Sequence, residues 1–468
     1  MNFSKSPPLY MFYNLPVYYL DFFQYYFFED VAIYYEVMKT AVSFLSGYLF
    51  YVFARDYVNR QAAFLLAVFF ILFPLHDSVN YLLQNAQYLL IAFGLIVYSH
   101  ALINNNSLKK GFLMGMLGSF FSYASPPFVW GLSVIFLMKK EYKKFLIFTA
   151  PQVIYTLYIL IAVKVFTLEK VRTIDSGNFS KLIKQFILQV LTFIDVAIGP
   201  SLAVKIYFSI LQLSFLSVAI GILIIVLFYK YYGFEKEKFN FHLFCAFSVV
   251  TVLAFCMFAV TGYYPQTAFN LGNRVTIYSS LLLAFLAGSF ISSNKKAAVI
   301  IFSILIFSIL GISDHWKDWN KKQKLIADNF AGNRDIISLD ASEPLFVSYN
   351  QFSKFGEISH IEFITEGVGG HLLKRAAKKD FKISPINKRF YVDNNVLIDR
   401  KWEIKFIVKD YINVYDSESD KLLKIEKNKI QNYIDSLPND NRHWAQLIDN
   451  KFINGVIVKL MPRLKYAF

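Results

Sequence analysis

Short polar segments interrupt the long apolar segments of this chain, and two of them carry acidic side chains. The first is the pair Glu29–Asp30, and the second is His76–Asp77 in the segment FPLHDSVNY. A carboxylate, or a carboxylate tuned by a neighbouring histidine, is a usual general base for taking a proton from a hydroxyl group. Ionisable groups at a membrane edge cost free energy, which makes both pairs candidates for a catalytic role. Each also has a structural interpretation: Glu29–Asp30 as a solvated helix start, and Asp77 as the N-cap of a helix that begins near Ser78.

A third polar segment, Asn273–Arg274 in LGNRVTIY, stands at the start of an apolar stretch. The planar guanidinium group of arginine stays charged and binds phosphate through two parallel hydrogen bonds. Arg274 with Asn273 is therefore a candidate site for the phosphate of a lipid-linked substrate. The alternative is that Arg274 only reaches from a helix end to the lipid headgroups.

Other familiar chemical signatures are missing from the sequence. It contains no spacing typical of metal ligands, no phosphate-binding P-loop, no dinucleotide fingerprint and no nucleophile elbow. We predict no metal site and no specific cofactor, although the sequence leaves room for a divalent cation.

The composition predicts a lipid bilayer as the main partner of the chain. Of its 468 residues, 56% are hydrophobic and only 17% are charged, and the mean hydropathy is +0.41. Soluble domains have about 25% charged residues. The net charge of +15 does not indicate a nucleic-acid partner, because Lys and Arg collect in the cytoplasmic loops of membrane proteins.

Ten segments are predicted as membrane-spanning helices: eight from their apolar runs, since a span needs about 20 mostly apolar residues, and two short ones from dividing the segment 111–138. They are 40–57, 61–75, 81–103, 111–123, 126–138, 145–164, 202–229, 241–262, 275–293 and 297–312. The fourth and fifth are short, and Pro126–Pro127 separate them. This division puts the basic segments on both sides of 111–138, NNNSLKK and KKEYKK, on the same membrane face.

With ten spans, the basic loops all fall on one face, which is predicted to be cytoplasmic. The N-terminal segment 1–39 and the C-terminal region 313–468 then both lie on the extracytoplasmic side. Between them, residues 40–312 form the transmembrane domain of a multi-pass protein of the plasma (cytoplasmic) membrane.

The remaining segments have other patterns. Residues 8–28 are aromatic but carry polar groups, as in a helix lying at the membrane interface, with a true span as the alternative. Residues 179–198 are amphipathic and are predicted to lie on the outer face. From 313 onward, a helix at 315–330 precedes alternating strand-like runs, so we predict one soluble α+β domain after an all-α membrane bundle.

The order of these elements resembles the GT-C superfamily of multi-span glycosyltransferases. The resemblance lies in an aromatic interfacial stretch, a span ending in the basic turn FYVFARDYVNR, and a span closing on FILFPLHDSVNY. It continues in paired short helices around SYASPPF, a late N-R before the span LGNRVTIYSSLLLAF, and the tryptophan-rich helix DHWKDWNKKQ.

Membership would imply transfer of a hexose or pentose from a polyprenyl-phosphate or dolichyl-phosphate donor to a glycan, lipid or protein acceptor at the outer face. By position, His76–Asp77 matches the acidic outer loop, and Arg274 matches the arginine that binds the phosphate. The chain departs from the family pattern at its start, where the usual first span and its aspartate are expected. Either both are missing here, or 8–28 is that span and Glu29–Asp30 is the acid pair.

Two other functions fit the same pattern. One is a flippase or transporter of lipid-linked sugars, a class that has broken helices with charges near the bilayer midplane. The other is a non-catalytic GT-C-like membrane protein that has kept the fold and lost the catalytic acid.

Overall fold

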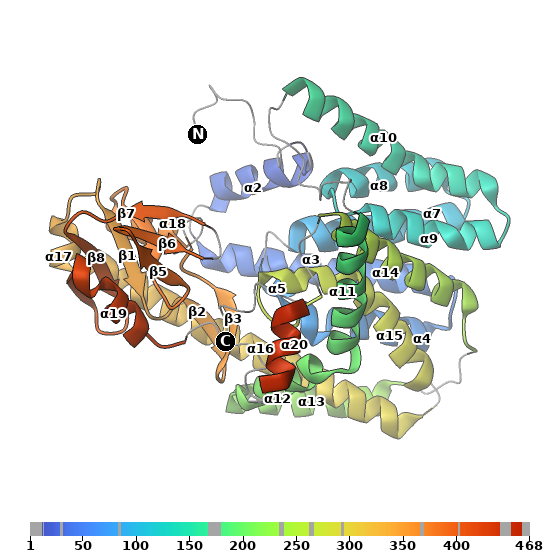
Figure 1. Ribbon diagram of the computed structural model, residues 1–468. Coiled ribbons are helices and arrows are strands. Elements are labelled where there is room, and N and C mark those ends of the chain that lie inside the picture. The colour runs from blue at the N-terminus through green and yellow to red at the C-terminus, as the bar shows by residue number, and fades with distance from the viewer. Residues whose placement is uncertain are drawn as a thin grey trace. The chain divides into compact units, whose positions relative to one another are not determined.

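The computed structural model divides the chain into two compact units, a helical one and a smaller mixed one (Figure 1). The helical unit comprises residues 1–268 and 272–312, and the mixed unit comprises 269–271 and 313–468. The residues that the structure describes are 12, 14–28, 31–82, 86–166, 179–233, 238–261, 266–291, 294–365, 369–400, 403–439 and 451–460.

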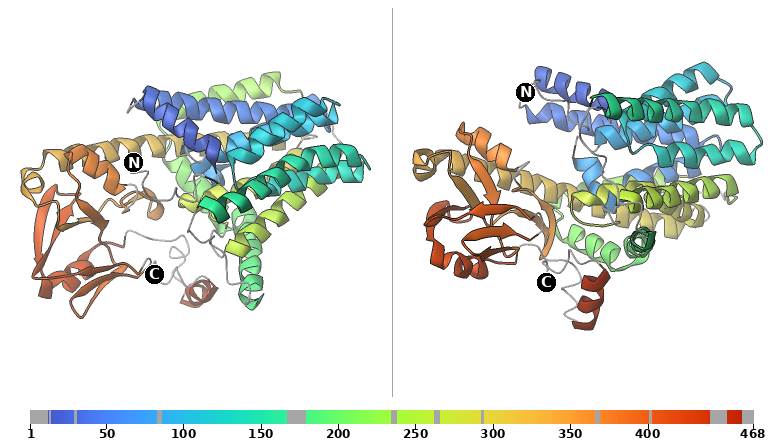
Figure 2. Two further views of the ribbon diagram at one scale, coloured as in Figure 1. Left: turned by 90° about the horizontal axis from the view of Figure 1, so that it is seen from above. Right: turned by 45° about the horizontal axis from the view of Figure 1, so that its top comes forward.

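The helical unit is a bundle whose early helices run alongside one another in both views of Figure 2. In chain order, its earlier helices are α2 (Leu15–Phe28), α3 (Ala32–Ala54), α4 (Arg60–Ile71), η1 (Pro74–His76), α5 (Asp77–Tyr81), the π-helical turn η2 (Ala86–Ile91), α7 (Ala92–Asn104), α8 (Leu108–Phe121) and α9 (Pro126–Met138). The later ones are α10 (Tyr142–Phe166), α11 (Phe179–Ile198), α12 (Pro200–Leu211), α13 (Phe215–Tyr231), α14 (Phe241–Thr261), η3 (Leu271–Thr276), α15 (Ile277–Ile291) and α16 (Lys295–Gly332).

Six of the described helices are long and apolar enough to cross a bilayer, or up to eight spans if each of two bent helix pairs counts as one. Their outward surfaces suit lipid: Leu157 and Leu160 on α10, and Leu216 and Leu223 on α13, are each more than half exposed. Rows of this kind are unusual on a soluble protein. The chain therefore has the features of a multi-pass membrane protein, while the predicted count of ten spans goes beyond what these helices establish.

One predicted span is wrong. The segment 202–229 is not a single helix, because α12 ends at Leu211 and α13 begins only at Phe215. The side chain of Ser214 caps α13 by accepting a hydrogen bond from the amide of Ser217 at 3.3 Å. A serine at this position satisfies the free amide groups of a new helix start and so favours the break.

The predicted turn between two short helices is confirmed. α8 ends at Phe121 and α9 begins at Pro126, with the Ser122 hydroxyl accepting a hydrogen bond from the Ala124 amide at 3.0 Å. Proline is favoured in the first turn of a helix because its missing N–H would have no partner there.

Contacts join several basic loops at one end of the bundle. The Asn240 side chain donates to the carbonyl of Tyr57 at 2.7 Å, which links the loop after α3 to the segment before α14. The Lys144 ammonium group donates to the carbonyl of Asn104 at 3.0 Å, which links the end of α7 to the start of α10. The loops that the sequence assigns to one membrane face thus lie at one end of the helical unit.

α16 is longer than predicted. Its 38 residues run without a break from Lys295 to Gly332, through both the predicted span 297–312 and the separate helix expected at 315–330. At 1.5 Å per residue the helix is about 57 Å long, nearly twice the hydrocarbon thickness of a bilayer. No proline interrupts the sequence between these two parts, so nothing local ends the helix.

The described residues of the mixed unit form three small sheets and confirm the predicted combination of strands and helices after residue 313. A four-stranded sheet has the order β4 (Lys382–Pro385), β1 (Pro344–Ser348), β8 (Tyr411–Asp416) and β9 (Lys421–Glu426), with β1 parallel to both neighbours and β9 antiparallel to β8. Two further sheets belong to the mixed unit. One is the hairpin of β2 (Phe352–Phe355) and β3 (Ile358–Glu362), and the other is the antiparallel sheet of β5 (Phe390–Asp393), β6 (Val396–Asp399) and β7 (Lys405–Ile407). Its helices are α17 (Arg334–Ser338), α18 (Gly369–Ala377), η4 (Lys427–Lys429), α19 (Ile430–Ser436) and α20 (Lys451–Leu460).

Candidate functional site

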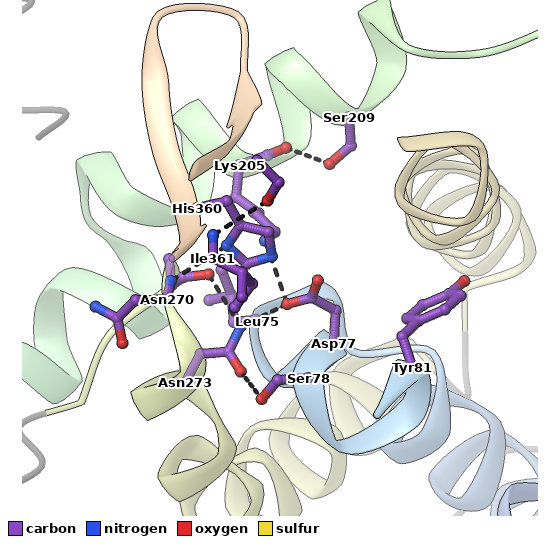
Figure 3. Close-up of polar contacts among 12 residues, drawn as sticks. Leu75, Asp77, Ser78, Tyr81, Lys205, Ser209, Asn270, Asn273, His360 and Ile361 are labelled. Atoms are coloured by element: carbon purple, nitrogen blue, oxygen red, sulfur yellow. Dashed lines mark hydrogen bonds and ion pairs between the residues drawn. The ribbon is translucent and has the colours of Figure 1, made fainter. Parts of the chain in front are cut away.

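A buried ion pair lies inside the helical unit. The Lys205 ammonium nitrogen is 3.2 Å from Oδ1 of Asp77, and both side chains are 0% exposed. Asp77 is the first residue of α5, and Lys205 is in the middle of α12, 128 positions later in the chain. Figure 3 shows the two side chains pointing toward each other.

Amide and hydroxyl groups extend this pair into a network. The Asn273 amide donates to the same Oδ1 of Asp77 at 2.5 Å, and the Ser78 hydroxyl donates to Oδ1 of Asn273 (Figure 3). The Thr276 hydroxyl donates to the carbonyl of Leu75 at 3.1 Å, which ties η3 to the short helix η1 just before Asp77. Asp77 thus receives charge-assisted hydrogen bonds from two segments that are distant in the sequence, which holds its carboxylate in place.

A break in the helix carries Asp77 into the interior. α4 ends at Ile71, Pro74 starts η1, and the two parts of the bent pair Arg60–Ile71 and Pro74–Tyr81 meet at 41°. The Asn80 side chain donates to the carbonyl of Ile71 at 3.0 Å and so replaces a hydrogen bond that the helix loses at the break. Proline causes such breaks because it has no amide hydrogen and disfavours a helical conformation in the residue before it.

Lys205 is held by a second break of the same kind. α11 and α12 also meet at 41°, at Gly199–Pro200. The Asp195 carboxylate accepts hydrogen bonds from the amide of Ser201 at 3.0 Å and from its hydroxyl at 2.5 Å, so it caps the start of α12. A carboxylate at a helix N-terminus satisfies free amide groups and interacts favourably with the helix dipole.

A close contact between α12 and α16 fixes the position of α12 within the helical unit. The carbonyl oxygen of Ser209, one turn after Lys205, lies 1.8 Å from where a Cβ atom on Gly311 of α16 would be. Only glycine permits this approach. Small residues at such contacts are typical of helices that pack closely in membranes.

The energetics of the pair indicate a role beyond stability. Two charges taken out of water regain little net free energy from each other, and apolar side chains of similar size are often as stable or more so. Charged groups inside a membrane domain are rare and mark substrate paths, proton paths or catalytic groups. The Asp77–Lys205 pair is therefore the strongest functional candidate among the described residues of the helical unit.

A second polar network lies between α11 and α15. The Gln266 side chain donates to the Gln189 side-chain oxygen at 3.2 Å and accepts from the Ser279 hydroxyl at 3.2 Å. Its backbone amide donates to the Thr192 hydroxyl at 3.1 Å. This network contains no charge and joins the segment after α14 to the helix that precedes the bend, so we assign it a structural role.

The structure brings two of the predicted site residues together. Asp77 and Asn273 are in direct contact, whereas His76 points into apolar surroundings, with its ring 5.7 Å from that of Phe70 and both nitrogens lacking a hydrogen-bond partner among the described residues. Arg274 follows Asn273 in η3 and is half-buried. Glu29 and Asp30 lie outside the described residues.

Lys205 is the residue that the sequence interpretation missed. The predicted span 202–229 includes this lysine, and the overall hydropathy of the span hides a single charge. A lysine in an apolar segment was the available signal, since such a charge needs a partner of opposite sign. The number of acidic residues in apolar surroundings is small, so Asp77 was already a reasonable partner.

The geometry places a buried carboxylate against a buried cation and a side-chain amide. Asp77 is closed off from solvent while it is bound to Lys205, so it reaches a substrate hydroxyl only if the pair opens. An incoming phosphate would compete for the ammonium group because it is also an anion. No protein-family model matches the chain, and no curated protein or solved structure is significantly similar to it.

Proposed function

We propose that this protein is a membrane glycosyltransferase that moves a sugar from a polyprenyl-phosphate donor to an acceptor at the outer face of the membrane. The observation that carries the proposal is the buried contact of Asp77 with Lys205 and Asn273. It combines a carboxylate with a cation and an amide, the groups that such a transfer needs. The GT-C resemblance of the sequence adds the substrate class.

The proposed reaction is a displacement at the anomeric carbon of the donor sugar. Asp77 takes the proton of the acceptor hydroxyl, whose oxygen forms the new glycosidic bond. The bond between the anomeric carbon and the phosphate oxygen breaks, and the polyprenyl phosphate leaves with the electron pair. Arg274, with Asn273, stabilises the negative charge that develops on that phosphate. Lys205 pairs with Asp77 before the donor binds and turns to the phosphate when it does.

Glu29–Asp30 remains the alternative acid pair. It would supply the base if residues 8–28 stand in for the first span of the family pattern. The helix α2 (Leu15–Phe28) within this segment carries Tyr26 and Phe27, which are 70% and 69% exposed. An exposed aromatic surface of this kind favours a helix at the membrane interface, which leaves Asp77 as the leading base.

Ten spans and an extracytoplasmic C-terminal domain belong to this proposal. Counting the short helices α8, α9 and α13 as spans, beside α3, α4–α5, η2–α7, α10, α14, α15 and α16, gives ten crossings. The joining of basic loops at one end of the bundle supports this arrangement, with that end in the cytoplasm. The protein would then be a multi-pass protein of the plasma membrane with residues 313–468 outside.

The topology can be checked by cysteine labelling. Cys245 and Cys256 would first be changed to alanine, and single cysteines introduced at Lys110 and Lys388, both of which are exposed. In intact cells, a membrane-impermeant thiol reagent is expected to label Lys388→Cys and to leave Lys110→Cys unlabelled until the cells are opened. Labelling of both, or of Lys110→Cys alone, in intact cells contradicts the ten-span arrangement.

The helix breaks specifically favour a second function. Asp77 and Lys205 each follow the break of a bent helix pair, and transporters bind substrates and ions at discontinuous helices. A flippase for lipid-linked sugars would use the opening and closing of the ion pair to pass a headgroup through the bundle.

One experiment separates these functions. The purified protein would be placed in liposomes with polyprenyl-phosphate hexoses and pentoses and a membrane extract as acceptor source. A glycosyltransferase is expected to release free polyprenyl phosphate in step with glycosylated product. A flippase would instead make the intact donor accessible in both leaflets without consuming it. If neither occurs with any donor, the non-catalytic interpretation replaces both.

A further inference from the structure

A groove of about 970 Å³ runs along the surface of the helical unit between α3, α4, α13 and α16. Its walls are mostly apolar and include Phe44, Phe64, Leu227, Phe302 and Ile306. Phe44 is 76% exposed and Leu227 is 45% exposed, so the rim faces outward. None of the described residues that line the groove is acidic.

One end of the groove is polar and positively charged. Arg60 lines it, is exposed, and forms no ion pair with any described residue. Two more cations adjoin lining tyrosines: the Arg55 guanidinium lies 5.6 Å from the ring centroid of Tyr51, and the Lys230 ammonium lies 5.1 Å from that of Tyr231. This end therefore attracts an anion.

A buried acceptor also lies at this end. The side-chain oxygen of Gln61 is buried and has no hydrogen-bond partner among the described residues. The backbone carbonyl of Gln61 is already bound by the Tyr232 hydroxyl at 3.1 Å, which fixes this residue against α13. An unsatisfied buried oxygen is costly, so a ligand that donates a hydrogen bond here would bind favourably.

The length of the groove matches one leaflet of a bilayer. Along α4 it extends from Arg60 to Leu72, about 18 Å at 1.5 Å per residue. Half of the hydrocarbon thickness of a bilayer is about 15 Å. A ligand with a charged end at Arg60 and an apolar body reaching toward Leu72 therefore has the dimensions of one membrane lipid. The charged end lies among the basic loops.

We propose that this groove binds an anionic glycerophospholipid from the leaflet on the side of the basic loops. Its phosphate lies against Arg60, a hydroxyl of its headgroup donates to the Gln61 side chain, and one acyl chain fills the apolar walls. A neutral or zwitterionic lipid would fill the walls but lose the net attraction to the cations. The site is distinct from the Asp77–Lys205 pair and does not depend on the proposed transfer reaction.

Native mass spectrometry of the full chain in detergent tests this site with phosphatidylglycerol and phosphatidylcholine of identical acyl chains. We expect the wild type to prefer phosphatidylglycerol about tenfold, because both lipids carry the phosphate but only phosphatidylglycerol has a net negative charge and headgroup hydroxyls that can donate a hydrogen bond. The Arg60→Gln variant should lose this preference, whereas Lys110→Gln, an exposed lysine in a different basic loop, should keep it. Val68→Phe narrows the groove and should lower the occupancy of both lipids.

Measurements on the wild type alone keep the proposal falsifiable if a variant fails to fold. At 1 M salt the screening length falls to about 3 Å, so the preference for the anionic lipid should shrink. Equal affinity for the two lipids, or a preference that Arg60→Gln leaves unchanged, overturns the proposal. Displacement of phosphatidylglycerol by an equal concentration of polyprenyl phosphate also overturns it, because the groove would then be a donor-lipid site.

Discussion

Lys205→Met is expected to destabilise the helical unit strongly, because it leaves the Asp77 carboxylate buried without a counter-charge. Removing one member of a buried ion pair costs about 3–5 kcal/mol. Asp77→Asn should also destabilise, since it leaves the ammonium group of Lys205 in the same apolar surroundings. The double variant Asp77→Asn/Lys205→Met removes both charges together and should recover most of the loss.

The apparent melting temperature in detergent, followed by the loss of monodisperse protein in size-exclusion chromatography, measures this cycle. Lys164→Met is the matched control, because Lys164 is an exposed lysine on α10 and its removal leaves no buried charge behind. A single variant as stable as the wild type would show that Asp77 and Lys205 are not paired in the membrane. A double variant whose loss of stability equals the sum of the two single losses would show that the two side chains act independently.

The second large effect that we expect is on the rate of glycosyl transfer. Asp77→Asn/Lys205→Met keeps the size of both side chains and, on the reasoning above, the stability of the unit. It lacks the carboxylate that we assign as general base, and such groups contribute about 10²–10⁴-fold to rate. We therefore expect glycosyl transfer to fall by at least about 10²-fold at saturating donor, while the amount of folded protein in membranes stays close to that of the wild type.

The variant Arg334→Lys serves as the control for expression and assay, because Arg334 is exposed on α17 in the mixed unit. Product formation would be measured per folded molecule, with release of polyprenyl phosphate as the readout. Undiminished transfer in the double variant removes Asp77 from the role of base. The matching replacements Glu29→Gln and Asp30→Asn would then identify whether the alternative acid pair carries the reaction.

The two helix breaks explain why the charges of this site are buried inside the bundle and do not lie at the ends of membrane-spanning helices. Each break lets a short helix enter the unit at an angle, so that a charged side chain on that helix lies in the interior. Asn80 and Asp195 satisfy the backbone groups that the breaks expose. The charge of Asp77 and the polarity of Asn273 are visible in the sequence, but their burial is a consequence of these breaks.

The sequence by itself determined the features that depend on local composition. Apolar stretches predict the membrane helices, Pro126 predicts the turn between α8 and α9, and alternating residues after 313 predict strands such as β8. Asp77 and Asn273 stood out for the same reason, as polar groups in apolar surroundings.

Only the tertiary structure decided which of these groups meet. Asp77 and Asn273 are 196 positions apart, and Lys205 is 128 positions from Asp77, so their contact depends on how α5, α12 and η3 pack. The break before α13 and the unbroken course of α16 have local causes that the predicted spans do not take into account. Hydropathy averaged over a segment does not register one capping serine or the lack of a helix breaker. The pairing of buried charges follows from packing, because each charge must find its partner across helices whose order along the chain does not fix their neighbours.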